Sequence, residues 1–331
     1  MWRSLALIAA ALACLGAASG HGWDLPGGRK PPPVPAANPM NAAKVELGRR
    51  LFYDADLSIN GTMSCATCHE QKHAFTDTNR SHPGVHGDPA RRNVMALANV
   101  GYFTALTWGD RRLATLEAQV AVPVLGAHPV EMGMAGQEAE LVRRLAASPC
   151  YRRQFAASFP KAKGEISMAA VSQALAAFER TLVSFDSPYD RQEPMSVEAR
   201  RGEALFRGRR LACANCHAGP LFTDADRRRA GFHDIGLPRR PADLGLSEVT
   251  GKAADQSRFR TPSLRNAELT APYLHDGSAP TLAEAIGAHA GARRAGITEG
   301  ETADLVAFLA TLTDRTFVAD PRFSLPKACR D

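Results

Sequence analysis

The pentapeptide Cys65-Ala66-Thr67-Cys68-His69 is the most informative stretch of this chain. Two cysteines separated by two residues and followed at once by a histidine are typical of covalent c-type haem attachment. The two thiols add to the vinyl groups of the porphyrin, and the adjacent imidazole can then ligate the iron. One such motif alone would also fit half of a zinc site or a redox-active CxxC pair.

The motif occurs a second time, as Cys213-Ala214-Asn215-Cys216-His217, and other landmarks recur with it. Upstream of the two motifs, Leu-Gly-Arg-Arg-Leu-Phe at 47–52 is echoed by Arg-Gly-Glu-Ala-Leu-Phe at 201–206. Downstream, Phe-Thr-Asp occurs at 75–77 and again at 222–224. Three matching landmarks in the same order indicate an internal duplication. The sequence therefore predicts two covalently bound haem c groups.

Composition sets limits on the kind of protein. The chain has 331 residues, enough for two domains that each bury a core of their own. With 45% hydrophobic and 22% charged residues, it has the composition of a globular protein. The formal net charge is +6, and the propionates of two haems would offset most of it. Arginine runs such as 227–229 are then solvated surface, so we expect no nucleic-acid partner.

Residues 1–20 are typical of an export signal. Arg3 supplies the positive end, residues 5–15 the apolar stretch, and residues 17–20 a small-residue cleavage region. The apolar stretch is too short to span a bilayer, and no later segment is apolar enough. Cys14 lies in a poor lipoprotein box, which argues against lipid anchoring there. We therefore expect a periplasmic protein without a membrane span, in the compartment where bacteria attach c-type haem.

Helix caps and helical periodicity dominate the rest of the chain. A helix is expected at 41–52, and Ser167 can cap another whose apolar stripe is core packing. Two capping boxes, Thr281 with Glu284 and Thr298 with Glu301, each start a further helix.

The fold class follows from these helices, since nothing resembles a run of alternating strands. We predict an all-α fold of two tandem cytochrome c-like haem domains with long loops. The predicted segments are a signal peptide at 1–20, a proline-rich lead-in at 21–40, an N-terminal haem domain at 41–190 and a C-terminal haem domain at 191–331.

The second iron needs an axial ligand opposite its motif histidine. Every methionine lies at or before Met195, so the second half cannot supply a methionine from within itself. Its candidate donors are His233, Tyr273, His275 and His289. His289 ends a short capped helix, which is a good platform for aiming one side chain. A lone histidine is also compatible with a purely structural role.

The first half carries polar and aromatic residues suited to peroxide chemistry. A tryptophan between two haems, such as Trp108, can relay electrons. A glutamate over an open iron, such as Glu131, can carry a proton from one peroxide oxygen to the other. Taken singly, Trp108 also fits a core side chain and Glu131 a surface acid. Gln119 and Pro123 lie between them in the same segment.

Landmarks over nearly the whole mature chain resemble the bacterial di-haem cytochrome c peroxidase/MauG superfamily. Besides the two CxxCH motifs, they are Phe-Thr-Asp at 75–77, Arg-Asn at 92–93, Thr-Trp-Gly-Asp-Arg at 107–111, Pro-Val-Glu-Met-Gly at 129–133, Arg-Thr-Pro-Ser-Leu-Arg-Asn at 260–266, and the run from Leu269 to Ser278. The Asn-Pro-Met start at 38–40 and the insertion at 125–129 are most similar to the MbnH branch, which is found alongside methanobactin genes.

The resemblance implies a set of residue roles. Haem would be attached at Cys65, Cys68, Cys213 and Cys216, and ligated by His69 and His217. Trp108 would lie between the haems, and the distal side of the first would be lined by Gln119, Pro123 and Glu131. A calcium ion between the haems would be bound by the Asn93 side chain and by the carbonyls of Thr270 and Pro272. The axial position of the second haem falls on His289, where family members carry Met or Tyr.

The resemblance also implies a reaction. The enzyme would use hydrogen peroxide to oxidise a residue on a partner protein through a high-valent di-haem state. In the MbnH branch the target would be a tryptophan, converted to kynurenine, on an MbnP-like copper-binding protein. Long-range charge transfer would be needed, since a folded partner cannot reach a buried iron. MauG places a surface tryptophan two residues before its second haem motif, where this chain has Leu211, so the exit route stays open.

Two other functions and one disulfide remain open. A cytochrome c peroxidase that detoxifies peroxide would often carry a distal histidine on the first haem, and His82 and His86 lie in the corresponding loop, which also fits solvated surface. An electron-transfer cytochrome without catalysis is the third interpretation. Cys150 and Cys329 remain once the signal and haem cysteines are assigned, either as a disulfide or as two free thiols.

Overall fold

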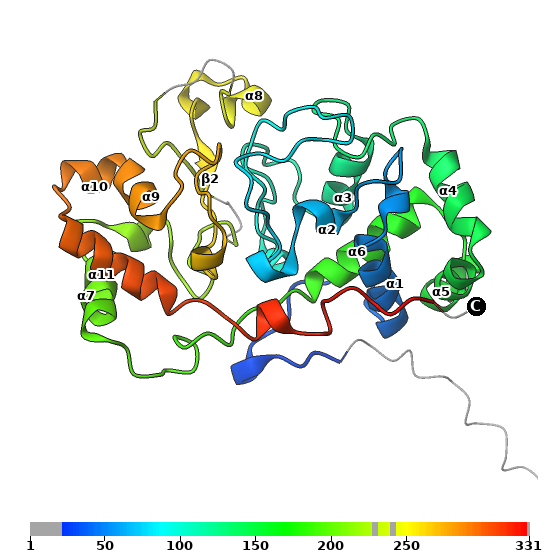
Figure 1. Ribbon diagram of the computed structural model, residues 1–331, viewed down its shortest axis with the longest axis horizontal. Coiled ribbons are helices and arrows are strands. Elements are labelled where there is room, and N and C mark those ends of the chain that lie inside the picture. Colours follow the sequence, from blue (N-terminus) through cyan, green and yellow to red (C-terminus); the bar gives the residue numbers. More distant parts are fainter. Residues whose placement is uncertain (1–21, 227–230, 239–242, 330–331) are drawn as a thin grey trace, which may run out of the picture.

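The computed structural model describes residues 22–226, 231–238 and 243–329 (Figure 1). The predicted signal peptide and Cys14 therefore lie outside the described residues, as does the arginine run at 227–229. Within the described ranges the protein is mostly helical, with long loops. Contrary to the strand-free expectation, β1 (Phe232–His233) pairs antiparallel with β2 (Phe259–Arg260). None of the helices in these ranges combines the length and the apolar character needed to cross a bilayer.

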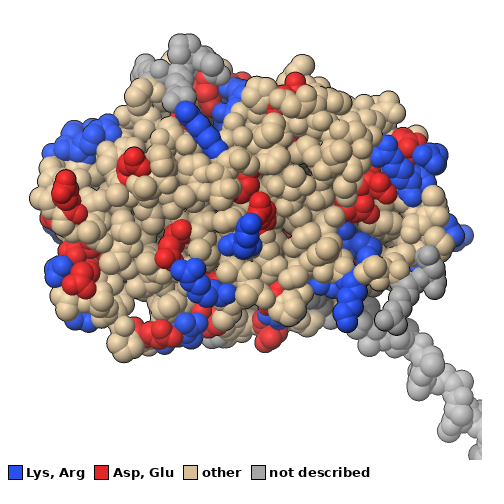
Figure 2. All heavy atoms as spheres, in the orientation of Figure 1, with Lys and Arg blue, Asp and Glu red and all other residues tan. Residues whose placement is uncertain are grey.

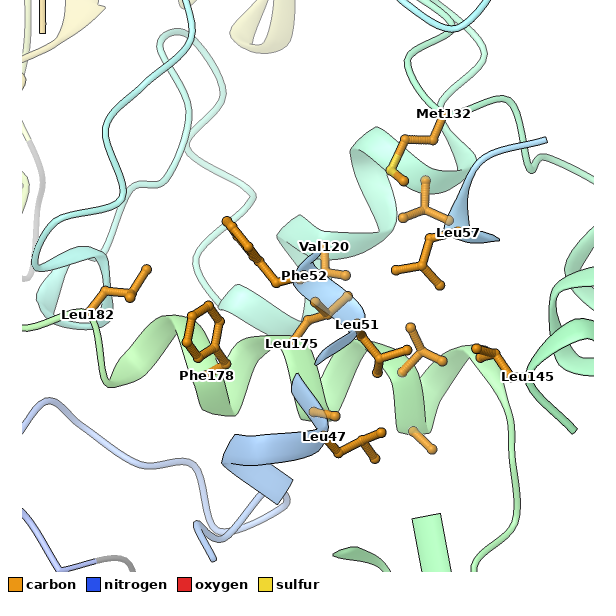
Figure 3. Close-up of a cluster of buried hydrophobic side chains, with 14 of the residues drawn as sticks. Leu47, Leu51, Phe52, Leu57, Val120, Met132, Leu145, Leu175, Phe178 and Leu182 are labelled. Carbon is orange, nitrogen blue, oxygen red and sulfur yellow. The ribbon is translucent and has the colours of Figure 1, made fainter. Parts of the chain in front are cut away.

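The first group of helices packs around the first CxxCH motif. It consists of α1 (Ala42–Phe52), α2 (Cys65–Cys68), α3 (Leu116–Leu125), α4 (Glu138–Ala147), α5 (Pro149–Ser158) and α6 (Met168–Arg180). The Asn41 side chain accepts a hydrogen bond from Lys44 N and so starts α1, which confirms the helix expected there. Leu47, Leu51 and Phe52 on α1 then pack against Leu175 and Phe178 of α6 (Figure 3).

The second group surrounds the second motif. It consists of α7 (Val197–Arg207), α8 (Ser247–Thr250), α9 (Leu282–Ala288), α10 (Ala290–Arg294) and α11 (Glu299–Ala310). The capping boxes predicted at Thr281 with Glu284 and at Thr298 with Glu301 are confirmed at the starts of α9 and α11. Short 3-10 turns complete the fold at Pro26–Gly28, Ala55–Leu57, Gln71–His73, Val100–Tyr102, Pro160–Ala162, Cys213–Asn215, Ala253–Asp255, Ala267–Leu269 and Phe317–Ala319.

The pairs α1–α6 and α7–α11 share one packing arrangement. In the first pair, a Cβ added at Gly48 would collide with the Ala174 carbonyl oxygen and lie 2.9 Å from Phe178 Cβ. In the second, a Cβ added at Gly202 would collide with the Asp304 carbonyl oxygen and lie 2.9 Å from Phe308 Cβ. Glycine thus lets the two helix backbones touch at the same point of each pair.

The C-terminal segment leaves the second group and crosses to the first, so that the chain ends beside α5 (Figure 1). There the rings of Phe317 and Phe323 pack against Phe75, with centroids 5.6 and 6.4 Å away. Cys150 and Cys329 form a disulfide with 6.0 Å between their Cα atoms. The pairing that the sequence left open is therefore present.

Gly202→Ala should destabilise the protein, because its new methyl group meets the Asp304 backbone across the α7–α11 contact. The expected loss is about 1–3 kcal/mol, measured as a lower Tm of the haem-loaded protein. Gly300→Ala, on α11 with nothing within 4 Å of its new Cβ, is the matched control and should be neutral or stabilise by up to about 1 kcal/mol. Equal Tm shifts in the two variants would contradict the close approach of α7 to α11.

Candidate di-haem site

The first CxxCH motif folds into a single helical turn, α2. Ser64 starts this turn through a capping box, in which Ser64 N donates to Thr67 Oγ1 at 3.0 Å. Cys65 and Cys68 both carry free thiols and are partly exposed. Burial raises the pKa of the Cys68 thiol to about 12, and the negative charge of Glu131 acts in the same direction. The turn therefore holds both cysteines close enough to Glu131 for its charge to act on them.

His69 is oriented by one backbone hydrogen bond. Its Nδ1 lies 2.8 Å from the Phe75 carbonyl oxygen, which can only accept, so Nδ1 carries the proton. Burial lowers the pKa of His69 and so favours the neutral ring. The lone pair of Nε2 is then available to a metal, the arrangement that proteins use to fix a ligating imidazole. Phe75 itself is held at φ +63°, which turns its carbonyl toward the ring.

The second motif repeats this arrangement. His217 Nδ1 lies 3.3 Å from the Phe222 carbonyl oxygen, and Phe222 has φ +49°. Burial, and then the nearby His289, lower the pKa of His217 to about 4. Both motif histidines are therefore neutral, half-buried and tethered at Nδ1, which fits the proximal ligands of two c-type haems.

His289 is placed opposite His217. The two ring centroids are 6.5 Å apart, and His289 Nδ1 lies 2.8 Å from the Ala285 carbonyl oxygen. An iron between two imidazoles needs about 6 Å between ring centres, because each metal–nitrogen bond is about 2 Å and each nitrogen lies about 1 Å from its ring centre. The observed separation therefore fits one iron held by both rings.

The other three candidate donors have different partners. His233 Nε2 lies 2.7 Å from Asp224 Oδ2. His275 is buried and stacks on Phe259 with 3.6 Å between ring centroids. The Tyr273 hydroxyl donates to the Ala267 carbonyl at 2.9 Å. Of the four, His289 is the one that faces His217.

Gln119, Pro123 and Glu131 are brought together beside the first motif. Gln119 and Pro123 lie on α3, and the Pro123 carbonyl accepts from Met132 N at 2.9 Å. This bond holds the loop that carries Glu131 against the helix. Burial raises the pKa of Glu131, with His82 opposing it. Gln119 Oε1 is buried without a hydrogen-bond partner, so it is ready to bind a small polar molecule.

The histidines of the neighbouring loop do not share this geometry. His82 Nδ1 lies 2.8 Å from the carbonyl oxygen of Pro83, the next residue, and His86 is exposed. The loop itself is tied to the Glu131 segment, since Val85 N donates to the Glu131 carbonyl at 2.7 Å. His82 is close enough to influence the charge on Glu131.

Trp108 is buried between segments from both halves of the chain. Its indole Nε1 donates to the Asn93 carbonyl at 2.8 Å, and its own carbonyl accepts from Arg260 N at 2.9 Å. Asn93 N in turn donates to the His275 carbonyl at 2.8 Å. The indole is therefore fixed where the two halves meet.

Asn93 is also one of the predicted calcium ligands. Its side-chain Nδ2 donates to the Asn79 carbonyl at 3.1 Å, which orients the amide. The described residues contain no group of three or more His, Cys, Asp or Glu side chains able to hold a metal ion. A cation here would therefore depend on amide and carbonyl oxygens, including those of Thr270 and Pro272, which suit calcium.

Two buried charges were missed by the sequence reasoning. Arg260 Nε and Asp224 Oδ1 are buried without hydrogen-bond partners. Burial lowers the pKa of Arg260 to about 10, and Asp224 opposes that shift. A buried guanidinium with a free N–H fits an anionic group such as a haem propionate. The sequence signals were the position of Arg260 at the start of the Arg-Thr-Pro landmark and that of Asp224 at the end of the repeated Phe-Thr-Asp.

Charged side chains of both signs are mixed on the face drawn in Figure 2. Nucleic-acid-binding proteins usually gather lysine and arginine on one face.

Comparisons with known proteins agree with this geometry. A family model described as di-haem cytochrome c peroxidase matches residues 42–195. The chain is 38% identical to the methylamine utilization protein MauG of Methylorubrum extorquens, over 85% of this chain and 81% of that protein. It is 34% identical to the cytochrome c551 peroxidase of Nitrosomonas europaea, over 89% and 86% of the two chains.

A solved structure extends the similarity to three dimensions. The crystal structure of a MauG-like protein associated with microbial copper homeostasis superimposes with a TM-score of 0.87 at 40% identity. The alignment covers 92% of this chain and 99% of that one. The likeness therefore extends over both halves of the chain.

His289→Ala should remove the sixth ligand of the second haem. The expected result is loss of the low-spin signal of that haem in the electron paramagnetic resonance spectrum, with a high-spin signal in its place. His233→Gln is the control, because the His233 ring is already bonded to Asp224. A low-spin signal that survives in the His289→Ala variant would show that another residue binds this iron.

Proposed function

Since the chain belongs to the di-haem cytochrome c peroxidase and MauG family, we propose that it uses hydrogen peroxide to oxidise a side chain on a partner protein. Members of this family are oxidoreductases that act on peroxide, and this chain is one of them. The observation that carries the finer proposal is the imidazole of His289 opposite His217. Methionine at that position would raise the reduction potential of the iron, whereas a second imidazole better tolerates higher oxidation states.

The chain supplies distinct groups to the two haem sites. The bound haems supply the redox chemistry that reduces peroxide and stores its oxidising equivalents. Glu131 takes a proton from one peroxide oxygen and returns it to the other, as general acid–base catalysis requires. Gln119 Oε1 accepts a hydrogen bond from bound peroxide and holds it beside Glu131. Trp108 provides the aromatic ring between the two halves.

The partner we propose is a copper-binding protein of the MbnP type, with a tryptophan that is converted to kynurenine. The support is the structural similarity to a MauG-like protein associated with microbial copper homeostasis.

The same proposal includes the cell compartment, the domain organisation and a structural ion. Export by residues 1–20 would bring the chain to the periplasm, where the Cys150–Cys329 disulfide would persist. Two tandem haem domains at 41–190 and 191–331 fit the repeated helix packing. Calcium bound by Asn93, Thr270 and Pro272 would connect the halves at Trp108.

A cytochrome c peroxidase is the second candidate, favoured by the 34% identity to the Nitrosomonas europaea enzyme. The experiment that separates the candidates is to add peroxide to the ferric holoprotein and follow its spectrum. A long-lived oxidised state that decays on addition of the copper-binding partner supports the proposal. Rapid turnover only with a reduced c-type cytochrome supports the peroxidase. Two low-spin haems that ignore peroxide would indicate an electron-transfer cytochrome.

The reaction with peroxide should depend on the ionisation of Glu131. Only the carboxylate can take the proton, and burial raises the Glu131 pKa above its ordinary value of 4.5. The rate should therefore increase as the pH rises through a pKa above 4.5. Glu131→Gln should remove this dependence and slow the reaction by about 10²–10⁴, measured by stopped-flow absorption.

The exposed Glu165 provides the control for that experiment. Glu165→Gln should keep both the rate and the pH profile of the unmodified protein. An unchanged profile in the Glu131→Gln variant would assign the proton transfer to another group.

A further inference from the structure

The ring of Tyr189 lies within a short aromatic path to the second motif histidine. Its centroid is 5.5 Å from that of Phe222 and 5.9 Å from that of Phe308, both in edge contacts. The Phe222 carbonyl is the group that lies 3.3 Å from His217 Nδ1. Tyr189 is therefore connected to His217 through its ring contact with Phe222 and through the hydrogen bond between the Phe222 carbonyl and His217 Nδ1.

The hydroxyl of Tyr189 has a proton acceptor beside it. It donates to Glu203 Oε1 at 3.3 Å and accepts from Arg207 Nη2 at 2.7 Å. Arg207 Nε also donates to Glu203 Oε1, at 2.9 Å, so α7 holds the carboxylate in place. Oxidation of a phenol releases its proton, and Glu203 can take that proton without help from solvent. Tyr189 is half-buried and the Arg207 side chain is 52% exposed, so this cluster reaches the surface.

The backbone around Tyr189 is held rigidly. Tyr189 N donates to the Thr311 carbonyl at 3.0 Å. The next residue, Asp190, accepts two hydrogen bonds from Arg265, at 2.7 and 2.8 Å. This bidentate ion pair is buried, since the Arg265 and Asp190 side chains are 1% and 5% exposed. The ring of Tyr189 therefore keeps its place against Phe222.

The corresponding position at the first motif lacks an oxidisable ring. Phe75 provides the carbonyl for His69, and the rings packed on it are those of Phe52, Phe317 and Phe323. Phenylalanine is much harder to oxidise than tyrosine and has no proton to give. The two halves thus share a scaffold but differ at this contact.

Each of the other four tyrosines lacks either the ring contacts that lead to a motif histidine or a carboxylate that accepts from its hydroxyl. Tyr53 lies 5.4 Å from Phe52, whose ring is 6.4 Å from His69, but its hydroxyl donates to the Phe323 carbonyl. The hydroxyls of Tyr102 and Tyr273 also donate to backbone carbonyls. Tyr151 donates to the Asp54 carboxylate, but it is 7% exposed and its ring partner Phe155 lies on the same helix.

From these contacts we infer that Tyr189 is the relay through which the second haem site draws electrons from an external donor. This inference rests on the proposed function. It supplies a route for electrons between the second haem site and the surface, which Leu211 cannot provide in place of the surface tryptophan of MauG. One electron passes from Tyr189 toward His217, and the phenol proton passes to Glu203. The resulting tyrosyl radical takes one electron from an electron-rich aromatic side chain of the partner, and Glu203 returns the proton. Hydrogen peroxide, the oxidant of the family, supplies the driving force.

The first test uses the haem-loaded protein, peroxide and a nitroso spin trap, without a partner. Mass spectrometry of the digested protein should find the trap adduct on Tyr189. Tyr189→Phe keeps the ring packing and should lose this adduct, with an unchanged absorption spectrum and an unchanged rate of reaction with peroxide. An adduct confined to Trp23 or to another tyrosine would overturn the relay.

The second test follows electron delivery from a defined donor, N-acetyltryptophanamide. Tyr189→Phe should slow the oxidation of this donor at least about tenfold. If the hydroxyl had only a structural role, its loss would not slow this step alone. Glu203→Gln should slow the same step and change its solvent deuterium isotope effect, because the proton acceptor is weaker. Tyr53→Phe is the matched control and should behave like the unmodified protein.

The outcomes separate the relay from the proposed function. If the unmodified protein shows no reaction with peroxide, the proposed function fails and the relay fails with it. If peroxide reacts and the donor is oxidised equally fast by the unmodified protein and by Tyr189→Phe, the relay alone is overturned. Equal slowing by Tyr53→Phe and Tyr189→Phe would likewise overturn it.

Discussion

A hydrogen bond from each motif histidine to a phenylalanine carbonyl is the constraint on which the rest of the structure depends. The bonds from His69 to Phe75 and from His217 to Phe222 fix which ring nitrogen carries the proton and where the other one points. Each phenylalanine adopts a positive φ, which is costly for a side chain of this size and is maintained by aromatic packing. The aromatic cores thus do more than bury apolar surface, because they hold the carbonyls that orient the metal ligands.

The two halves keep this constraint and differ in what surrounds it. Near the first motif, the chain places the carboxyl group of Glu131 and, on α3, the unpartnered Gln119 Oε1, whereas beside His217 it places the imidazole of His289. Two local features account for this difference. The Pro123 carbonyl holds the loop that carries Glu131, and the capped helix α9 positions His289 at its C-terminal end. Under the proposed function, the two similar halves would serve two separate tasks, the first reacting with peroxide and the second exchanging electrons.

Local features of the sequence were sufficient to predict much of this site. Caps and CxxCH motifs depend on residues close together in the chain, so the start of α9 and the turn at Cys65 could be anticipated. Features that join distant residues could not: the Cys150–Cys329 pairing spans 179 residues, and periodicity carries no information on such distances. The short pairing of β1 with β2, the unpartnered Nε atom of Arg260 and the ring contact of Tyr189 with Phe222 were missed for the same reason.

The return of the C-terminal segment to Phe75 makes the order of synthesis important. Phe317 and Phe323, whose rings pack on Phe75, follow the second CxxCH motif in the sequence. This part of the N-terminal core is therefore complete only after the second half has been synthesised. A fragment cut in the linker between the halves would lack these two rings. Truncation before Phe317 would therefore leave the aromatic core around Phe75 incomplete.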